Sequence, residues 1–150
     1  MATEAKFEFR RRARRRALQA LYQRALTDQD AAIILEQFHE EQDFSNVDVE
    51  LFTTLVKEIC AKQADLDEKI TPFLDRPLKQ LDVVEHVILS IGAYELLYSL
   101  EVPHQVVIDE AVNLAKKFGA EQGHSFINAV LDKAARQWRD PANMSPFTAG

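Results

Sequence analysis

The chain contains little glycine, proline or cysteine. Its 150 residues include four glycines, five prolines and one cysteine, Cys60. Glycine and proline are the residues that most often interrupt regular structure, so their scarcity in a chain that is 47% hydrophobic favours long helices with short connections. The chain also lacks a turn-punctuated series of β-branched runs that would indicate a sheet. We therefore predict an all-α fold.

A single cysteine excludes an intramolecular disulfide and a cysteine-based metal site. Cys60 is expected to be a buried thiol on a helix, in a reducing compartment. The amino terminus has no apolar segment typical of a secretion signal, and no stretch reaches 18 uninterrupted apolar residues. We expect a soluble cytoplasmic protein without membrane contact.

The motifs that usually mark catalysis are also missing. There is no G-x-x-x-x-G-K, G-x-G-x-x-G or G-x-S-x-G, and the carboxylates occur mainly at predicted helix starts and on solvated faces. The four histidines lie on different predicted elements, and none belongs to an H-E-x-x-H motif. We predict no enzymatic activity, no cofactor and no metal.

Positive charge is concentrated near the amino terminus, where Arg10 to Tyr22 reads R-R-R-A-R-R-R-A-L-Q-A-L-Y. Residues 1–25 carry eight basic and two acidic side chains, a net charge of +6. The rest of the chain carries ten basic and 22 acidic side chains, a net charge of −12. A basic helix on an acidic protein indicates a polyanionic partner, most plausibly nucleic acid.

Helical periodicity divides this segment into two faces. Ala13, Ala17 and Leu21 lie on an apolar face, whereas Arg11, Arg12, Arg15 and Arg16 spread over the other. Arg10 and Arg14 fall on the line of the apolar face, which is tolerable if their aliphatic stems pack while their guanidinium groups reach water. The alternative is an ordinary solvated face, but a run of one sign repels itself, which favours contact with nucleic acid.

The apolar pattern and the capping signals predict seven helices within one domain, residues 9–139. Residues 1–8 are expected to form a flexible arm and residues 140–150 a disordered tail. The first helices are expected at about 9–26, from 31 through 38, from 48 to about 64, and a short one from Asp65 that Pro72 limits. The last three are expected at 83–100, through Val107 to a left-handed cap at Gly119, and after Gly123 to about 139.

The fifth predicted helix is apolar on nearly every side, so we place it in the middle of the fold. Glu85 and Glu95 are its exceptions and are expected to face outward. Gly92 in its interior costs helix stability, which indicates a close approach by another helix.

Phe126 lies off the apolar stripe of the last helix, near its amino terminus. An aromatic side chain in that place could stack on a nucleic-acid base. Packing of Phe126 against a neighbouring helix explains the residue equally well.

Several sequence motifs occur together in an order that resembles the bacterial NusB family of transcription antitermination factors. Besides the arginine helix, the matching segments are 74–78 (LDRPL), 93–97 (AYELL), 107–112 (VIDEAV), 116–119 (KKFG) and 126–133 (FINAVLDK). The resemblance implies a bundle of seven helices in two subdomains. It also implies a function without catalysis, in which single-stranded boxA RNA of ribosomal-RNA transcripts is bound together with the ribosomal protein NusE, within the RNA polymerase antitermination complex.

The resemblance also implies roles for particular residues. The family's protein-partner surface falls on the fourth and fifth helices, where Glu85 is the clearest match. Gln122 and Gly123 depart from the family's usual acidic residue and serine. The RNA-binding residues implied are Arg10, Arg11, Arg12, Arg14, Arg15 and Phe126.

Two other functions remain open from the sequence. The same helical domain occurs at the front of ribosomal-RNA cytosine methyltransferases, so the chain could be a fragment of such an enzyme. It could also be a homodimeric interaction protein whose arginines pair with the acidic surface of a second copy.

Overall fold

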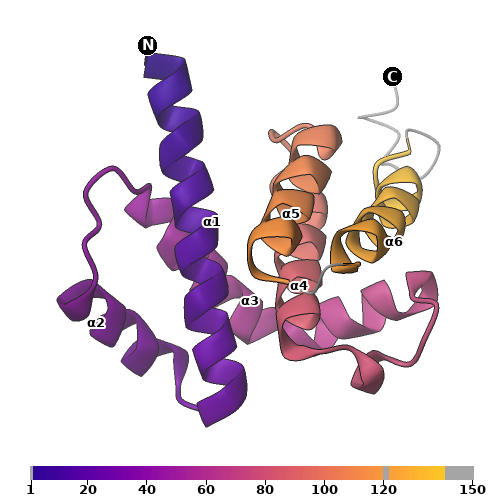
Figure 1. Ribbon diagram of the computed structural model, residues 1–150, viewed down its shortest axis with the longest axis horizontal. Helices are drawn as coiled ribbons and strands as arrows, with labels where there is room; N and C mark the ends of the chain where they lie inside the picture. Colours follow the sequence, from indigo (N-terminus) through magenta and orange to yellow (C-terminus); the bar gives the residue numbers. More distant parts are fainter. Residues whose placement is uncertain (1, 120–121, 141–150) are drawn as a thin grey trace. The chain divides into compact units, whose positions relative to one another are not determined.

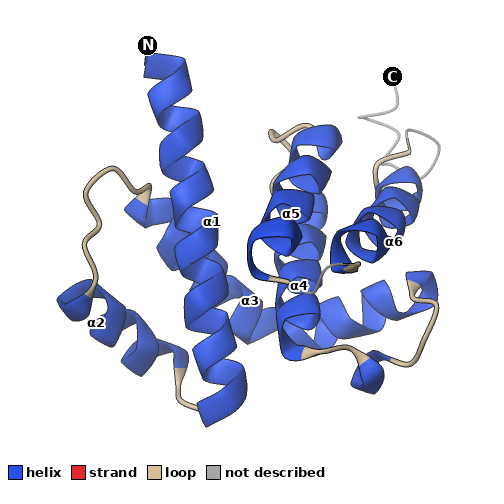
Figure 2. Ribbon diagram, viewed as in Figure 1, coloured by secondary structure: helices blue, strands red, loops and turns tan. Residues whose placement is uncertain are grey.

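The computed structural model describes residues 2–119 and 122–140, and its regular structure in these ranges is entirely helical (Figures 1 and 2). The fold is all-α, as predicted, but it has six α-helices where we expected seven. The predicted disordered tail lies, from residue 141 on, outside the described residues. The helices are α1 (Ala2–Thr27), α2 (Ala31–Glu41), α3 (Val49–Ile70), α4 (Val83–Tyr98), α5 (His104–Phe118) and α6 (Gly123–Trp138), with 3₁₀ turns η1 (Thr71–Phe73) and η2 (Leu78–Gln80) before α4.

The count differs because the third and fourth predicted helices are one continuous helix, α3. Asp65 was expected to begin a new helix, but it lies inside α3 and forms an ion pair of 2.9 Å with Lys69 one turn later. Leu66 and Ile70 are buried and continue the apolar stripe of the preceding turns. The helix ends two residues before Pro72, as the restriction that proline imposes on helices predicts.

Helix α1 begins at Ala2, whereas the sequence prediction placed an arm over residues 1–8 and a helix start near Phe9. Extending an existing helix costs far less than nucleating a new one, and alanine, glutamate and lysine in this segment are good helix formers. Glu8 also pairs with Arg11 at 3.6 Å, one turn further on.

The chain divides into two compact units, in agreement with the two subdomains expected from the resemblance. The N-terminal unit comprises residues 1–63 and the C-terminal unit residues 64–150, so α3 contributes to both. Aromatic rings form part of the N-terminal core, where Phe52 lies 5.9 Å from Phe38 and 5.0 Å from Phe44 between ring centroids.

Helix α4 is central to the C-terminal unit, where α4, α5 and α6 all contact one another (Figure 1). A Cβ atom on Gly92 would lie 2.7 Å from a methyl carbon of Leu131 on α6, which confirms the predicted close approach. The prediction that Glu85 and Glu95 face outward is wrong. They are 9% and 1% exposed, because α5 and α6 flank α4 and leave it little free surface.

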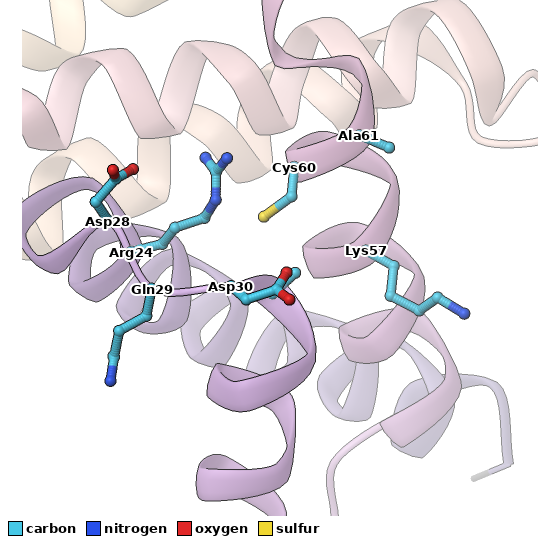
Figure 3. Close-up of a pocket in the computed structure, with 8 residues that line it drawn as sticks. Arg24, Asp28, Gln29, Asp30, Lys57, Cys60 and Ala61 are labelled. Carbon is cyan, nitrogen blue, oxygen red and sulfur yellow. The ribbon is translucent and has the colours of Figure 1, made fainter.

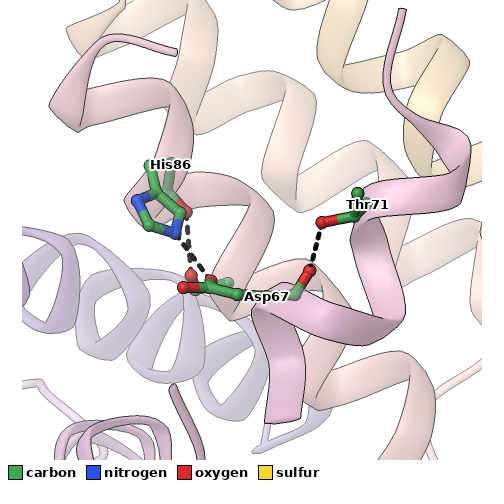
Figure 4. Close-up of polar contacts among 4 residues, drawn as sticks. Asp67, Thr71 and His86 are labelled. Atoms are coloured by element: carbon green, nitrogen blue, oxygen red, sulfur yellow. Dashed lines mark hydrogen bonds and ion pairs between the residues drawn. The ribbon is translucent and has the colours of Figure 1, made fainter. Parts of the chain in front are cut away.

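Two polar contacts fix the two ends of α4. Near its start, His86 Nε2 lies 2.7 Å from the Asp67 carboxylate on α3, and the Thr71 hydroxyl donates to the Asp67 carbonyl (Figure 4). At its end, the Arg139 guanidinium donates to the carbonyl oxygens of residues 95, 96, 99 and 102 at 2.6–3.2 Å. The Glu95 and Ser99 carbonyls also accept from the backbone amides of Ser99 and Val102. For the Leu96 and Val102 carbonyls, which follow the end of the helical ladder, Arg139 supplies the donor.

Gly119 ends α5, but not in the left-handed conformation that we expected. Its φ of −93° and ψ of −178° are extended. Glycine is required there for space, because a Cβ would lie 2.8 Å from the Ala115 carbonyl oxygen.

Candidate nucleic-acid interface

The arginines of α1 differ in how far they reach solvent. Arg12 is exposed, and Arg10, Arg11 and Arg15 are partly exposed. Arg14 is only 2% exposed, because it lies on the apolar face of α1, one turn before the buried Leu18. Arg14 is therefore not on the exposed surface of α1, and its predicted contact with RNA stays a prediction.

Three of these arginines contact the connection between α2 and α3. Arg12 Nη1 donates to the Asn46 carbonyl at 3.2 Å, and Arg10 approaches the Asp48 carboxylate at 4.0 Å. The Arg16 guanidinium lies 5.5 Å above the Phe44 ring. The backbone adds a hydrogen bond of 3.1 Å from the Asp48 amide to the Phe9 carbonyl. This side of α1 thus holds the connection in place and presents positive charge at the same time.

Arg15 stands outside this contact network, and Arg11 has contacts on α1 itself. Arg11 pairs with Glu8 and lies 5.2 Å over the Phe7 ring, both on its own helix. Arg15 has no ion-pair or hydrogen-bond partner within residues 2–119 and 122–140. Partly exposed pairs such as Arg11 and Glu8 contribute little to stability. The Arg15 guanidinium can turn to an anionic ligand.

Phe126 lies in the first turns of α6, in the C-terminal unit, and is partly exposed. Its ring is not bare, because the Arg76 guanidinium lies over it with Cζ 4.2 Å from the ring centroid. Phe126 is a site residue predicted from the sequence, whereas Arg76 is not. The two residues are 50 positions apart, and only the tertiary structure brings them together.

Glu85 belongs to the same neighbourhood. One of its carboxylate oxygens lies 3.3 Å from the place where a Cβ on Gly123, the first residue of α6, would be. Burial raises the pKa of Glu85 above its ordinary value of 4.5, and the nearby charge of Asp82 adds to this shift, while Arg76 opposes it. Glu85 is thus a mostly buried carboxyl group that keeps a small exposed area.

The N-terminal unit also contains a cavity of about 360 Å³, which is a weaker candidate for a functional site than the arginines of α1 or the surroundings of Phe126. Arg24, Asp30 and Cys60 line it, and the Lys57 ammonium points away from the thiol (Figure 3). Burial raises the pKa of Cys60, which makes the thiol a poorer nucleophile.

No cluster of three or more potential metal ligands is found in the described part of the chain. Nor is any helix there long and apolar enough to cross a membrane.

Comparison with known proteins decides which family the chain represents. The model of the NusB family matches residues 11–136. The chain belongs to the NusB family. This match contains Arg11, Arg12, Arg15, Arg76, Glu85 and Phe126, whereas Arg10 and Arg139 lie outside it.

Individual NusB relatives agree along most of their length. The transcription antitermination protein NusB of Xanthomonas axonopodis pv. citri is 45% identical over 130 residues, which cover 87% of this chain and 82% of that protein. The NusB protein of Xanthomonas oryzae pv. oryzae is equally similar and is covered to 83%. A solved structure of T. maritima NusB superposes with a TM-score of 0.75 at 30% identity, covering 85% of this chain and 90% of that one. The helical arrangement is therefore the NusB fold.

Proposed function

We propose that this protein is a non-catalytic transcription antitermination factor that binds boxA RNA of ribosomal-RNA transcripts together with the ribosomal protein NusE. Arg10, Arg11, Arg12 and Arg15 contact RNA phosphates, and Phe126 contributes to base stacking. Glu85 belongs to the surface that binds NusE. The complex acts in the cytoplasm, on RNA polymerase.

The observation that carries this proposal is the row of arginines along one helix. A single-stranded RNA has a continuous line of phosphates, and side chains at successive turns of a helix can neutralise several of them. Phosphate contacts of this kind position the RNA, whereas its sequence is recognised through the bases. Membership of the NusB family supports the RNA and the antitermination complex as the biological setting.

The test is RNA binding by a variant with Arg11→Glu and Arg15→Glu. We choose these positions because Arg12 also supports the Asn46 turn. The double reversal should weaken binding of a boxA oligonucleotide by about 100-fold at moderate salt, since it removes two phosphate contacts and adds repulsion. Fluorescence anisotropy measures the affinity, with and without purified NusE.

Arg136→Glu is the matched control, because Arg136 is a highly exposed arginine on α6 in the other unit. Equal affinity of the double variant and the wild type would refute the proposed role of α1. Thermal denaturation of each variant checks that the fold is retained.

A further inference from the structure

Arg76 and Phe126 form one composite surface in the C-terminal unit. The guanidinium lies over the ring with Cζ 4.2 Å from its centroid, which is well within the range of a cation–π contact. Arg76 therefore covers part of one face of the very ring to which base stacking is assigned. Any RNA that approaches this face meets the guanidinium before it meets the ring.

The guanidinium is held in this position from its side. Its Nε donates to one Asp75 carboxylate oxygen at 2.7 Å and its Nη2 to the other at 3.3 Å. The Asp75 contact raises the pKa of Arg76, so the side chain stays charged. Nη1 has no acceptor within the described ranges, and the Arg76 side chain keeps 39% of its surface exposed. The planar Arg76 guanidinium thus lies on the Phe126 ring and points its Nη1 donors to solvent.

We propose that Arg76 is an RNA-binding residue and that the bases of the RNA stack on the Arg76 guanidinium, which Phe126 supports from below. This inference rests on the proposed RNA-binding function. Guanidinium planes serve as stacking surfaces for unpaired bases in the same way as aromatic rings, and Arg76 adds a positive charge and the Nη1 donors for a phosphate or base oxygen.

The competing arrangement is a removable cover, in which Arg76 swings away and the base stacks on the bare ring. That arrangement sacrifices the Phe126 contact and strains the paired hydrogen bonds to Asp75 before any base contact is gained. Stacking on the guanidinium keeps both, so it requires no such rearrangement. The two arrangements predict opposite effects of removing the Arg76 side chain.

The test measures binding of a boxA oligonucleotide by fluorescence anisotropy at several salt concentrations. Arg76→Ala and Phe126→Ala should each weaken binding by about tenfold, and the double variant should be little worse than either one, because the two residues act as one surface. Arg76→Ala should also reduce the slope of log affinity against log salt by about one. Arg76→Lys should restore that slope but little of the affinity, since it retains the charge and lacks the plane. Arg136→Ala serves as the control and should change neither quantity.

The other outcomes would overturn the inference. Tighter binding by Arg76→Ala, with weaker binding by Phe126→Ala, would show that Arg76 is a cover. An Arg76→Ala affinity equal to that of Arg136→Ala, with Phe126→Ala still impaired, would remove Arg76 from the site and leave the proposed function standing. Failure of the wild-type protein to bind this RNA, alone and with NusE, would overturn both. Circular dichroism confirms that each variant is folded.

Discussion

The surroundings of each arginine on α1 decide whether it supports the fold or is available to a ligand. Arg14 is buried, and Arg12 and Arg16 contact the connection between α2 and α3. Arg15 has no hydrogen-bond or ion-pair partner in the described ranges. A run that looks uniform in the sequence therefore contains residues with different roles. Neighbouring acidic groups should modulate the arginines that we propose as RNA-binding residues.

Asp48 is the acidic group that tests this idea most directly. One of its oxygens accepts a hydrogen bond of 3.0 Å from the Leu51 amide at the start of α3, and the other faces Arg10 at 4.0 Å. Asp48→Asn keeps an oxygen for the helix start and removes the negative charge beside Arg10. We expect RNA affinity to rise about two- to threefold, with stability changed by less than about 0.5 kcal/mol.

Binding titrations and urea denaturation measure the two effects of Asp48→Asn. Glu58→Gln is the control, because it also removes one negative charge, from a pair with Lys62 on α3. Equal gains in affinity for the two variants would mean that overall charge, rather than the Asp48 contact, accounts for the effect.

Glu85 carries a pH dependence that follows from its burial. Its pKa is raised above 4.5 in the folded state, so folding favours the protonated form. The free energy of unfolding therefore falls as the pH rises from the pKa of an ordinary carboxyl group through the raised pKa of Glu85, because the group ionises over this range. Glu85→Gln should be more stable than the wild type at neutral pH, by less than about 1 kcal/mol, and this advantage should vanish below about pH 4. Urea denaturation at both pH values measures it.

Glu40→Gln, at an exposed position on α2, controls for the general loss of one charge. A Glu85→Gln variant less stable than the wild type at neutral pH would contradict the assigned cause. It would mean that the ionised carboxylate stabilises the start of α6 more than its burial costs.

At the scale of elements, Arg139 joins the end of α6 to the end of α4. Its guanidinium donates to four carbonyls, two of them at 2.6 and 2.9 Å. Arg139→Ala would remove the donor of the Leu96 and Val102 carbonyls, and the second hydrogen bond of the Glu95 and Ser99 carbonyls. We therefore expect it to destabilise the protein by about 2–4 kcal/mol. Arg139→Lys should recover less than half of this loss, because one ammonium cannot reproduce the planar fork of donors.

Urea denaturation measures the loss, and Arg136→Ala is again the control. Arg136 is on the same helix, but its side chain is 80% exposed and its pair with Asp132 should contribute less than about 0.5 kcal/mol. Comparable effects of the two alanine variants would show that the Arg139 contacts add little to stability.

The sequence predicts elements well where one local signal dominates. The apolar surface of α4 and its internal Gly92 predict a central helix with a close neighbour, and the structure has both. Prediction fails where a local signal competes with a longer pattern. Asp65 resembles a helix start, but the apolar stripe that continues through Leu66 keeps α3 intact.

Tertiary contacts explain the remaining differences at the candidate site. The burial of Glu85 depends on the packing around α4, and the helical wheel of α4 contains no information on those neighbours. The pairing of Arg76 with Phe126 joins a segment before α4 to the first turns of α6. Periodicity locates such residues on their own helices, but it cannot predict which of them meet.

For the whole molecule, the important feature is the separation of charge along the chain. Residues 1–25 carry a net charge of +6 and the remainder a net charge of −12. Opposite charges on one protein suit the proposed binding of both an anionic RNA and a basic protein. Both encounters should be faster at low salt, because both depend on attraction between opposite charges.

Charge reversal should separate these two binding events. Arg11→Glu with Arg15→Glu should reduce RNA affinity and lower the slope of log affinity against log salt by about two, because two phosphate contacts are lost. The same variant should bind NusE at least as well as the wild type, since a more acidic protein attracts a basic partner more strongly. Glu85→Lys should weaken NusE binding without weakening RNA binding by the protein alone, because its added positive charge lies near Arg76. Parallel titrations of each variant with RNA and with NusE at several salt concentrations measure both affinities. Equal loss of both ligands by both variants would mean that RNA and NusE share one surface. The charge separation along the chain would then not distinguish the two ligands.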